Sequence, residues 1–112
     1  NRFDYAYIHI KETDLPGHDN KPLEKKEMIE YTDKTLFKFL REFAPSMGIK
    51  VVVTADHSTP CRLKAHSADP VPVLFYNNSI LREKKFCERE ARIGSLGRIM
   101  GNDLLKIVKF VK

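Results

Sequence analysis

The sequence predicts an α/β fold, with a mostly parallel sheet flanked by helices, in one domain spanning residues 1–112. Three short runs rich in aromatic and β-branched residues have the length of strands: 3–10 (FDYAYIHI), 49–53 (IKVVV) and 71–76 (VPVLFY). The segment between the first two has helical periodicity. A strand, a helix and a second strand in this order predict a right-handed βαβ unit with parallel strands.

The predicted helix covers residues 23–43. Its apolar side chains recur at helical spacing: Ile29, Leu36, Leu40 and Phe43. Charged side chains fill the opposite face: Lys25, Lys26, Glu30, Lys34, Lys38 and Arg41. Pro45 and Gly48 are expected to end the helix. The β-branched run 49–53 that follows is typical of a strand covered on both faces.

Turn-forming residues predict two loops around these elements. Residues 11–21 contain Pro16 and Gly17, and residues 55–72 contain three prolines among polar residues. A long polar loop that follows a buried strand is a common place for functional residues.

The last third of the chain has a weaker pattern. Residues 79–92 fit either a helix or irregular structure, and residues 94–101 are expected to form a loop. Residues 103–111 predict a short final helix, capped by Asn102 or Asp103.

Composition narrows the class of protein. The formal charge of +5 comes from Lys and Arg scattered among acids, so a nucleic-acid partner is not expected and an anionic small substrate explains the excess equally well. No apolar run approaches the ~20 residues that span a bilayer, so no membrane partner is expected. Cys61 and Cys87 lack metal or disulfide spacing, which favours reduced thiols in the cytoplasm. Because the chain starts at Asn1 within a few residues of a strand, we expect a piece of a longer polypeptide.

Five side chains near the predicted strand ends are candidate metal ligands: Asp14, His18, Asp56, His57 and His66. Loops at one edge of a parallel sheet converge, so these residues are expected to meet there. Carboxylates and imidazoles suit Zn²⁺, Mn²⁺ or Fe²⁺ in sites that keep an open position. Because such ligands must be deprotonated, metal affinity should fall in mild acid. The alternative is that each Asp-His pair only caps a loop or forms surface hydrogen bonds.

Other polar residues have weaker assignments. His9 lies inside the first predicted strand, which favours a core or wall histidine over a ligand. Lys11 and Lys64 are candidate phosphate contacts, with solvated lysines as the alternative. Cys61 lies beside a candidate ligand loop and is expected to serve packing.

Three motifs carry a family resemblance: KETDLPGHD, TADHSTPCRLKAHSADPVPVL and FCEREARIGSLGRIMGNDLL. In order, they resemble the C-terminal part of cofactor-independent (2,3-bisphosphoglycerate-independent) phosphoglycerate mutases, in the archaeal-type branch of the alkaline phosphatase superfamily. The resemblance implies that residues 1–112 form the C-terminal part of an alkaline-phosphatase-like, metal-binding domain. The N-terminal part of that domain, with its serine nucleophile, is then absent from this chain.

The activity that the resemblance implies is interconversion of 3-phosphoglycerate and 2-phosphoglycerate through a phosphoserine at a two-metal site. The metals are commonly manganese, with magnesium, zinc or cobalt as alternatives. By motif, Asp14, His18 and His66 resemble the ligands of one metal, and Asp56 and His57 resemble two ligands of the second. The resemblance implies that another Asp and the nucleophilic Ser, both from the N-terminal part, complete the second metal site. Three serines of this chain lie in segments where the family carries no nucleophile: Ser58, Ser67 and Ser95.

The tail motif leaves two interpretations open. An arginine such as Arg89 or Arg92 can bind a substrate carboxylate or phosphate bidentately, or it can pair with neighbouring acids. For the whole protein, rival functions are another metalloenzyme of the superfamily, such as a phosphatase or phosphopentomutase, and a non-catalytic module that binds metal or anions. The fragment alone is expected to be inactive, with phosphoglycerate and the missing N-terminal part as its partners.

Overall fold

The computed structural model describes residues 3–79 and 84–111. The chain divides into two compact units. The first comprises Asn1–Lys38 with Thr59–Ser67, and the second comprises Phe39–Ser58 with Ala68–Lys112. Each unit is therefore built from two separate stretches of sequence.

The first unit begins with an extended segment, residues 3–10, that forms no β-ladder with any described residue. It was predicted to be a buried strand, but its aromatic and apolar side chains are exposed, including Phe3, Tyr7 and Ile8. His9 is also exposed, so the prediction of a core or wall histidine is wrong. The physical reason is that a strand becomes buried only when neighbouring strands pair with it and other elements cover its faces.

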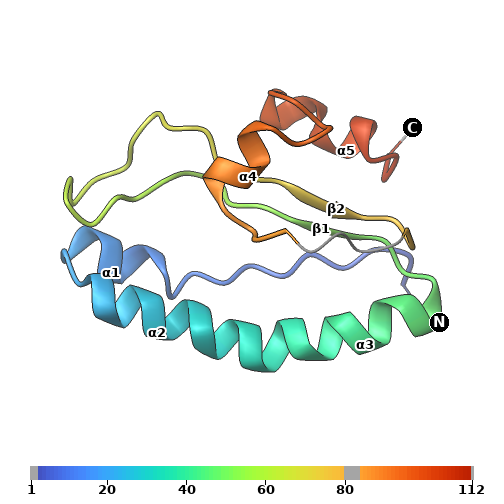
Figure 1. Ribbon diagram of the computed structural model, residues 1–112, viewed down its shortest axis with the longest axis horizontal. Helices are drawn as coiled ribbons and strands as arrows, with labels where there is room; N and C mark the ends of the chain where they lie inside the picture. Colours follow the sequence, from blue (N-terminus) through green and yellow to red (C-terminus); the bar gives the residue numbers. More distant parts are fainter. Residues whose placement is uncertain (1–2, 80–83, 112) are drawn as a thin grey trace. The chain divides into compact units, whose positions relative to one another are not determined.

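Residues 11–21 contain a short helix, α1 (Asp14–His18), where a loop with a tight turn was predicted. Pro16 is the third helical residue, and an amide hydrogen in the first turn of a helix has no intrahelical acceptor. The proline therefore removes no hydrogen bond from this helix. α1 packs against α2 (Pro22–Thr32), as Figure 1 shows.

The predicted helix 23–43 is confirmed and extends further. The chain is helical through α2, a π-helical segment η1 (Asp33–Phe37) and, in the second unit, α3 (Lys38–Met47). Pro22 occupies the first helical position, where a proline is favoured. Pro45 was expected to end the helix, but it lies inside α3.

The helix ends at Gly48 in a Schellman motif. The amide of Ile49 donates to the carbonyl of Ala44 (2.9 Å), and the amide of Gly48 donates to that of Pro45 (3.4 Å). Gly48 has a φ of +63°, which a glycine adopts without a steric penalty. Termination is thus set by the left-handed glycine, because a proline removes one hydrogen bond without reversing the chain.

The second unit contains two paired strands, β1 (Val51–Val53) and β2 (Leu74–Tyr76). They are antiparallel, with Val51 opposite Tyr76, Val52 opposite Phe75 and Val53 opposite Leu74. The described residues thus form a two-stranded antiparallel sheet, and the predicted mostly parallel sheet is not confirmed (Figure 1). Parallel strands need a crossover that returns the chain to the starting end. The β1–β2 connection contains no helix to provide one.

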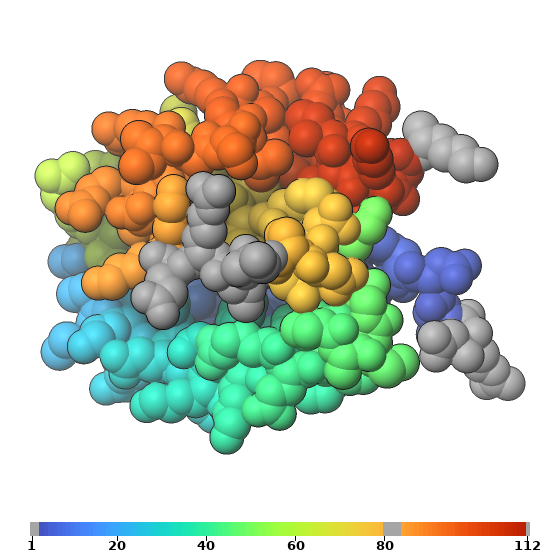
Figure 2. Space-filling view, turned by 45° about the vertical axis from the view of Figure 1, so that its right-hand side comes forward, coloured from blue at the N-terminus to red at the C-terminus, as the bar shows by residue number. Residues whose placement is uncertain are grey.

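Packing in the second unit joins the strands to the C-terminal segment. Among the described residues, the buried hydrophobic side chains are Ala44 and Val108, both 1% exposed. The rings of Phe75 in β2 and Phe110 meet edge to face, with centroids 6.3 Å apart. Figure 2 shows this C-terminal segment, in red, against the yellow β2 segment. The side chains of β1 are half-buried, whereas coverage of both faces was predicted.

The C-terminal third follows the predicted outline. Residues 88–92 form α4 (Glu88–Arg92), and the predicted loop follows it; residues 80–83 of the ambiguous 79–92 segment lie outside the described residues. A 3₁₀ turn η2 (Gly101–Asp103) precedes the final helix α5 (Leu104–Ile107). Asp103 is the N-cap residue of α5, although its side chain makes no capping hydrogen bond.

Within the described stretches of the chain, we find no helix long and apolar enough to cross a membrane.

Candidate metal centre

Helix α1 presents Asp14 and His18 on the same face of the first unit. The two residues are four positions apart, which brings their side chains together on a helix. The Nε2 atom of His18 lies 3.5 Å from Oδ1 of Asp14. The helix starts where the Asp14 amide donates to the carbonyl of Lys11 (3.1 Å). The D-x-x-x-H spacing of the sequence is therefore realised as one helical turn.

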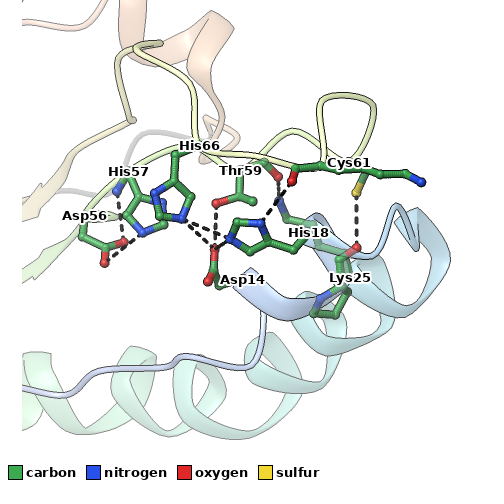
Figure 3. A network of polar contacts seen from close by, with 10 residues as sticks. Asp14, His18, Lys25, Asp56, His57, Thr59, Cys61 and His66 are labelled. Atoms are coloured by element: carbon green, nitrogen blue, oxygen red, sulfur yellow. Dashed lines mark hydrogen bonds and ion pairs between the residues drawn. The ribbon is translucent and has the colours of Figure 1, made fainter.

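His66 reaches the same place from the loop 59–67, which belongs to the same unit. Its Nε2 atom lies 3.2 Å from Nε2 of His18 and 3.6 Å from Oδ1 of Asp14. Figure 3 shows the two rings and the carboxylate pointing toward one another. The loop is tied to the helices by Lys25, whose Nζ donates to the carbonyl of Thr59 (2.8 Å). A weaker contact joins Cys61 Sγ to the carbonyl of Pro16 (3.9 Å).

The hydrogen bonds of His18 determine which of its nitrogens faces the cluster as an acceptor. Its Nδ1 lies 3.2 Å from the carbonyl oxygen of Lys64, and a carbonyl can only accept. In the neutral ring, Nδ1 therefore carries the hydrogen and Nε2 presents a lone pair to Asp14 and His66. These electron-rich atoms repel one another unless a hydrogen or a cation lies among them. The neutral His66 ring with its hydrogen on Nε2 can donate to His18 Nε2 (3.2 Å), and a shared metal cation would satisfy all three atoms.

The three atoms fit a divalent metal. They form a nearly equilateral triangle with edges of 3.2, 3.5 and 3.6 Å. Donors arranged tetrahedrally about 2.1 Å from a zinc-like cation lie roughly 3.4 Å apart, which matches these edges. Contact between His18 Nδ1 and a backbone carbonyl is also the usual outer support of a metal-binding histidine. The donor set and its spacing therefore suit a metal ion.

The cluster is open on one side. The exposed fractions of the side chains are 31% for Asp14, 38% for His18 and 50% for His66. Three protein donors with access to solvent leave room for a further ligand such as water or a phosphate oxygen.

Asp56 and His57 form a separate pair in the second unit, directly after β1. The His57 amide donates to Asp56 Oδ1 (3.0 Å), and His57 Nε2 lies 3.4 Å from Asp56 Oδ2. The Thr54 hydroxyl donates to the carbonyl of Pro72 (3.1 Å) and links the two ends of the β1–β2 loop. The structure brings these two predicted ligands together, and their place in a site with the other three stays a prediction.

The candidate substrate-binding residues have exposed side chains: Lys11, Lys64, Arg89 and Arg92. Arg89 is 92% exposed, and its Nη2 lies 3.8 Å from Oε1 of Glu90, in line with the alternative of pairing to a neighbouring acid. Lys64 contributes to the cluster through its backbone carbonyl, which the sequence does not indicate. Cys61 and Cys87 are free thiols.

Sequence reasoning missed Thr59 and Gly17. The Thr59 hydroxyl donates to Oδ1 of Asp14 (2.7 Å), and Thr59 is only 6% exposed. Gly17 is buried and packs directly against Thr59. The one available signal was the Ser-Thr-Pro sequence that follows Asp56-His57, because a hydroxyl residue next to a ligand motif can support a carboxylate.

Comparison with known proteins supports the family resemblance that the sequence motifs indicated. A protein named 2,3-bisphosphoglycerate-independent phosphoglycerate mutase from Pyrococcus furiosus is 42% identical over 108 residues, covering 95% of this chain and 26% of its own length. A protein with the same name from Picrophilus torridus is also 42% identical over 108 residues, with the same coverage. The chain thus spans about a quarter of the length of these relatives.

A solved structure shares the fold. The structure titled "Structure of PH0037 protein from Pyrococcus horikoshii" is 42% identical, with a TM-score of 0.78, and the match covers 91% of this chain and 31% of that one. The resemblance to archaeal phosphoglycerate mutases that the motifs indicated is confirmed. The family model described as "Metalloenzyme superfamily" matches residues 1–109, and the chain therefore belongs to the Metalloenzyme superfamily.

Proposed function

We propose that Asp14, His18 and His66 bind one divalent metal ion, most readily Mn²⁺. The single observation that supports this is the convergence of three donor atoms, from one helix and one loop, at separations of 3.2–3.6 Å. Three additional facts agree: the carbonyl that orients His18, the open side of the cluster and membership of the Metalloenzyme superfamily. Imidazole and carboxylate donors are compatible with manganese as well as zinc.

We further propose that this chain is the C-terminal part of a 2,3-bisphosphoglycerate-independent phosphoglycerate mutase that acts in glycolysis and gluconeogenesis. The names and 42% identity of the relatives support this, together with the metal centre. In this proposal Asp56 and His57 supply two ligands of a second metal. The remaining ligands and the serine nucleophile come from polypeptide outside these 112 residues.

The chemistry divides between metals and protein. Bound divalent cations neutralise phosphoryl oxygens and activate the attacking hydroxyl. The chain's own residues hold the ligand geometry: α1 sets Asp14 and His18 one turn apart, and the Lys64 carbonyl fixes the ring of His18. The exposed cationic side chains named above remain candidates for contact with substrate anions.

The test is to supply the full-length protein with 3-phosphoglycerate and Mn²⁺ and to follow the products by ³¹P NMR. We expect 2-phosphoglycerate to accumulate to equilibrium and the conversion to stop when EDTA removes the metal. Release of inorganic phosphate alone would favour a phosphatase instead. Metal binding without any turnover of the full-length protein would favour the non-catalytic module.

A further inference from the structure

We infer that Thr59 is a positioning residue for the metal ligand Asp14, and that Lys25 and Gly17 in turn hold Thr59. This inference rests on the proposed metal site. It adds residues that hold a ligand in place without binding the metal themselves. All of these residues belong to the first unit, so one compact body carries both the ligands and their support.

The first argument concerns the Asp14 carboxylate. The Thr59 hydroxyl donates to Oδ1 over 2.7 Å, and Oδ1 is also the oxygen that faces the Nε2 atoms of both histidines. A carboxylate oxygen has two lone pairs. The hydroxyl therefore holds the same oxygen that faces the two histidines, so this hydrogen bond restrains rotation of the carboxylate about its last torsion angle.

The second argument concerns the burial of the donor. Thr59 is only 6% exposed, so water has little access to compete with its hydroxyl for Asp14. A hydroxyl donates without adding charge. A cationic donor in the same place would orient the carboxylate too, but it would repel a metal ion at close range. Thr59 therefore orients the ligand while leaving its negative charge available.

The third argument concerns how Thr59 is placed. Lys25 Nζ donates to the Thr59 carbonyl (2.8 Å), which ties the start of the loop to α2. On the side of α1, Gly17 lies so close that a Cβ atom there would be 2.7 Å from the Thr59 carbonyl oxygen and 3.0 Å from its Cγ2. Only a residue without a side chain permits this approach. Both helices thus determine the position of one threonine, and Figure 3 shows its link to Lys25.

The test compares Mn²⁺ binding by three variants of the full-length protein, with the free ion measured by its EPR signal. Thr59→Val keeps the shape but removes the donor, and we expect about 10- to 100-fold weaker binding at one class of site, the usual effect of losing an outer hydrogen bond to a ligand. Thr59→Ser restores the donor and should recover most of the affinity. Thr32→Val is the matched control, because the Thr32 hydroxyl donates to the helix carbonyl of Met28 (2.9 Å) and not to a candidate metal ligand.

The outcomes separate the two proposals. If the unmodified protein binds no Mn²⁺, the proposed metal function is wrong. If it binds Mn²⁺ and Thr59→Val binds equally tightly, or if Thr59→Ser is as weak as Thr59→Val, the positioning role is wrong.

A second pair of variants covers the case in which Thr59→Val does not fold, which circular dichroism would reveal. Lys25→Met removes the anchor of the Thr59 carbonyl and should also weaken Mn²⁺ binding. Lys26→Met is its control, because Lys26 is exposed and lies 3.6 Å from Glu30. Equal Mn²⁺ affinity of these two variants would overturn the inference.

Discussion

Single residues at the candidate metal centre differ in what their side chains and backbones contribute. His18 uses one nitrogen for the Lys64 carbonyl and the other for the cluster, so its ring is oriented before any metal binds. His66 is half exposed and comes from a loop, so its position depends on how that loop is anchored. Loss of either imidazole leaves two donors, too few for tight binding of a divalent ion.

We therefore expect His18→Ala and His66→Ala each to lower the metal content of the full-length protein by one ion per chain. His9→Ala is the control, because His9 is exposed and its ring lies near that of Tyr7, with centroids 6.4 Å apart, and not in the Asp14–His18–His66 cluster. Elemental analysis by mass spectrometry measures the stoichiometry. Equal metal content in all three variants would remove the ligand assignment.

Gly17 offers a second prediction at the scale of one residue. Because an added Cβ would meet the backbone of Thr59, we expect Gly17→Ala to lower the free energy of unfolding by about 1–3 kcal/mol, the usual cost of overpacking. Gly101→Ala is the control, since a Cβ there has no neighbour within 4 Å. Urea unfolding of both variants, followed by circular dichroism, checks this. A Gly17→Ala variant as stable as Gly101→Ala would contradict the close packing.

The candidate ligands of the cluster could be predicted from the sequence, whereas the residues that hold these ligands in place could not. Asp14, His18 and His66 stand out because few other roles place a carboxylate and two imidazoles in such motifs. Thr59 and Gly17 are common residues, and the sequence does not show that a hydroxyl or a missing Cβ lies beside Asp14. The Lys64 carbonyl has no sequence signal, because every residue has one.

Among the secondary-structure elements, the long helical stretch was the most predictable, because its periodicity extends over many turns. The short elements were less so. α1 was predicted as a loop because Pro16 and Gly17 are turn-forming residues, yet both are tolerated in a helix of one turn. β1 and β2 were located correctly, but their direction depends on the path of the chain between them, which residue types do not encode.

The end of the long helix gives a prediction at the scale of elements. Gly48 has a φ of +63°, and the nearest atom to an added Cβ is Asn78 Nδ2 at 4.0 Å, so space is not limiting. We expect Gly48→Ala to cost about 1 kcal/mol of stability, because a left-handed backbone is strained for alanine. Gly48→Asn should cost less, since asparagine tolerates this conformation better.

Urea unfolding of the two Gly48 variants provides the measurement. Equal stability of Gly48→Ala and the unmodified protein would show that the Schellman motif is not required to end the helix.

At the scale of the whole molecule, the described residues expose much apolar surface. Phe3 is 84% exposed, Tyr7 75% and Leu23 74%, while the fully buried hydrophobic side chains are Ala44 and Val108. Large exposed apolar areas usually mark surfaces that another polypeptide covers. In the proposed function, that polypeptide is the rest of the mutase.

We expect backbone amides in residues 3–10 to exchange hydrogen quickly in the isolated 112-residue chain and slowly in the full-length protein. The reason is that this extended segment makes no β-ladder with described residues, and a partner strand from further polypeptide would protect its amides from exchange. Hydrogen–deuterium exchange followed by mass spectrometry measures the difference. Equal exchange rates in both forms would contradict the idea that further polypeptide pairs with residues 3–10.

The isolated chain should also lack mutase activity, because the serine nucleophile of the proposed mechanism lies outside it. We expect no 2-phosphoglycerate from 3-phosphoglycerate and no phosphorylated protein with the purified 112 residues, checked by ³¹P NMR and intact-mass measurement. Either product would show that these residues contain a nucleophile of their own.

Lys64 (φ +51°) contacts His18 through its backbone carbonyl and not through its side chain. An alanine scan removes the amine of Lys64 and leaves in place the peptide oxygen that faces His18, so such a scan does not test the role of that oxygen. An alignment of relatives would not reveal this role either, because every amino acid at this position has a backbone carbonyl oxygen. Replacing the following amide by an ester through chemical synthesis, which weakens that oxygen as an acceptor, would reveal a contribution that side-chain exchange cannot.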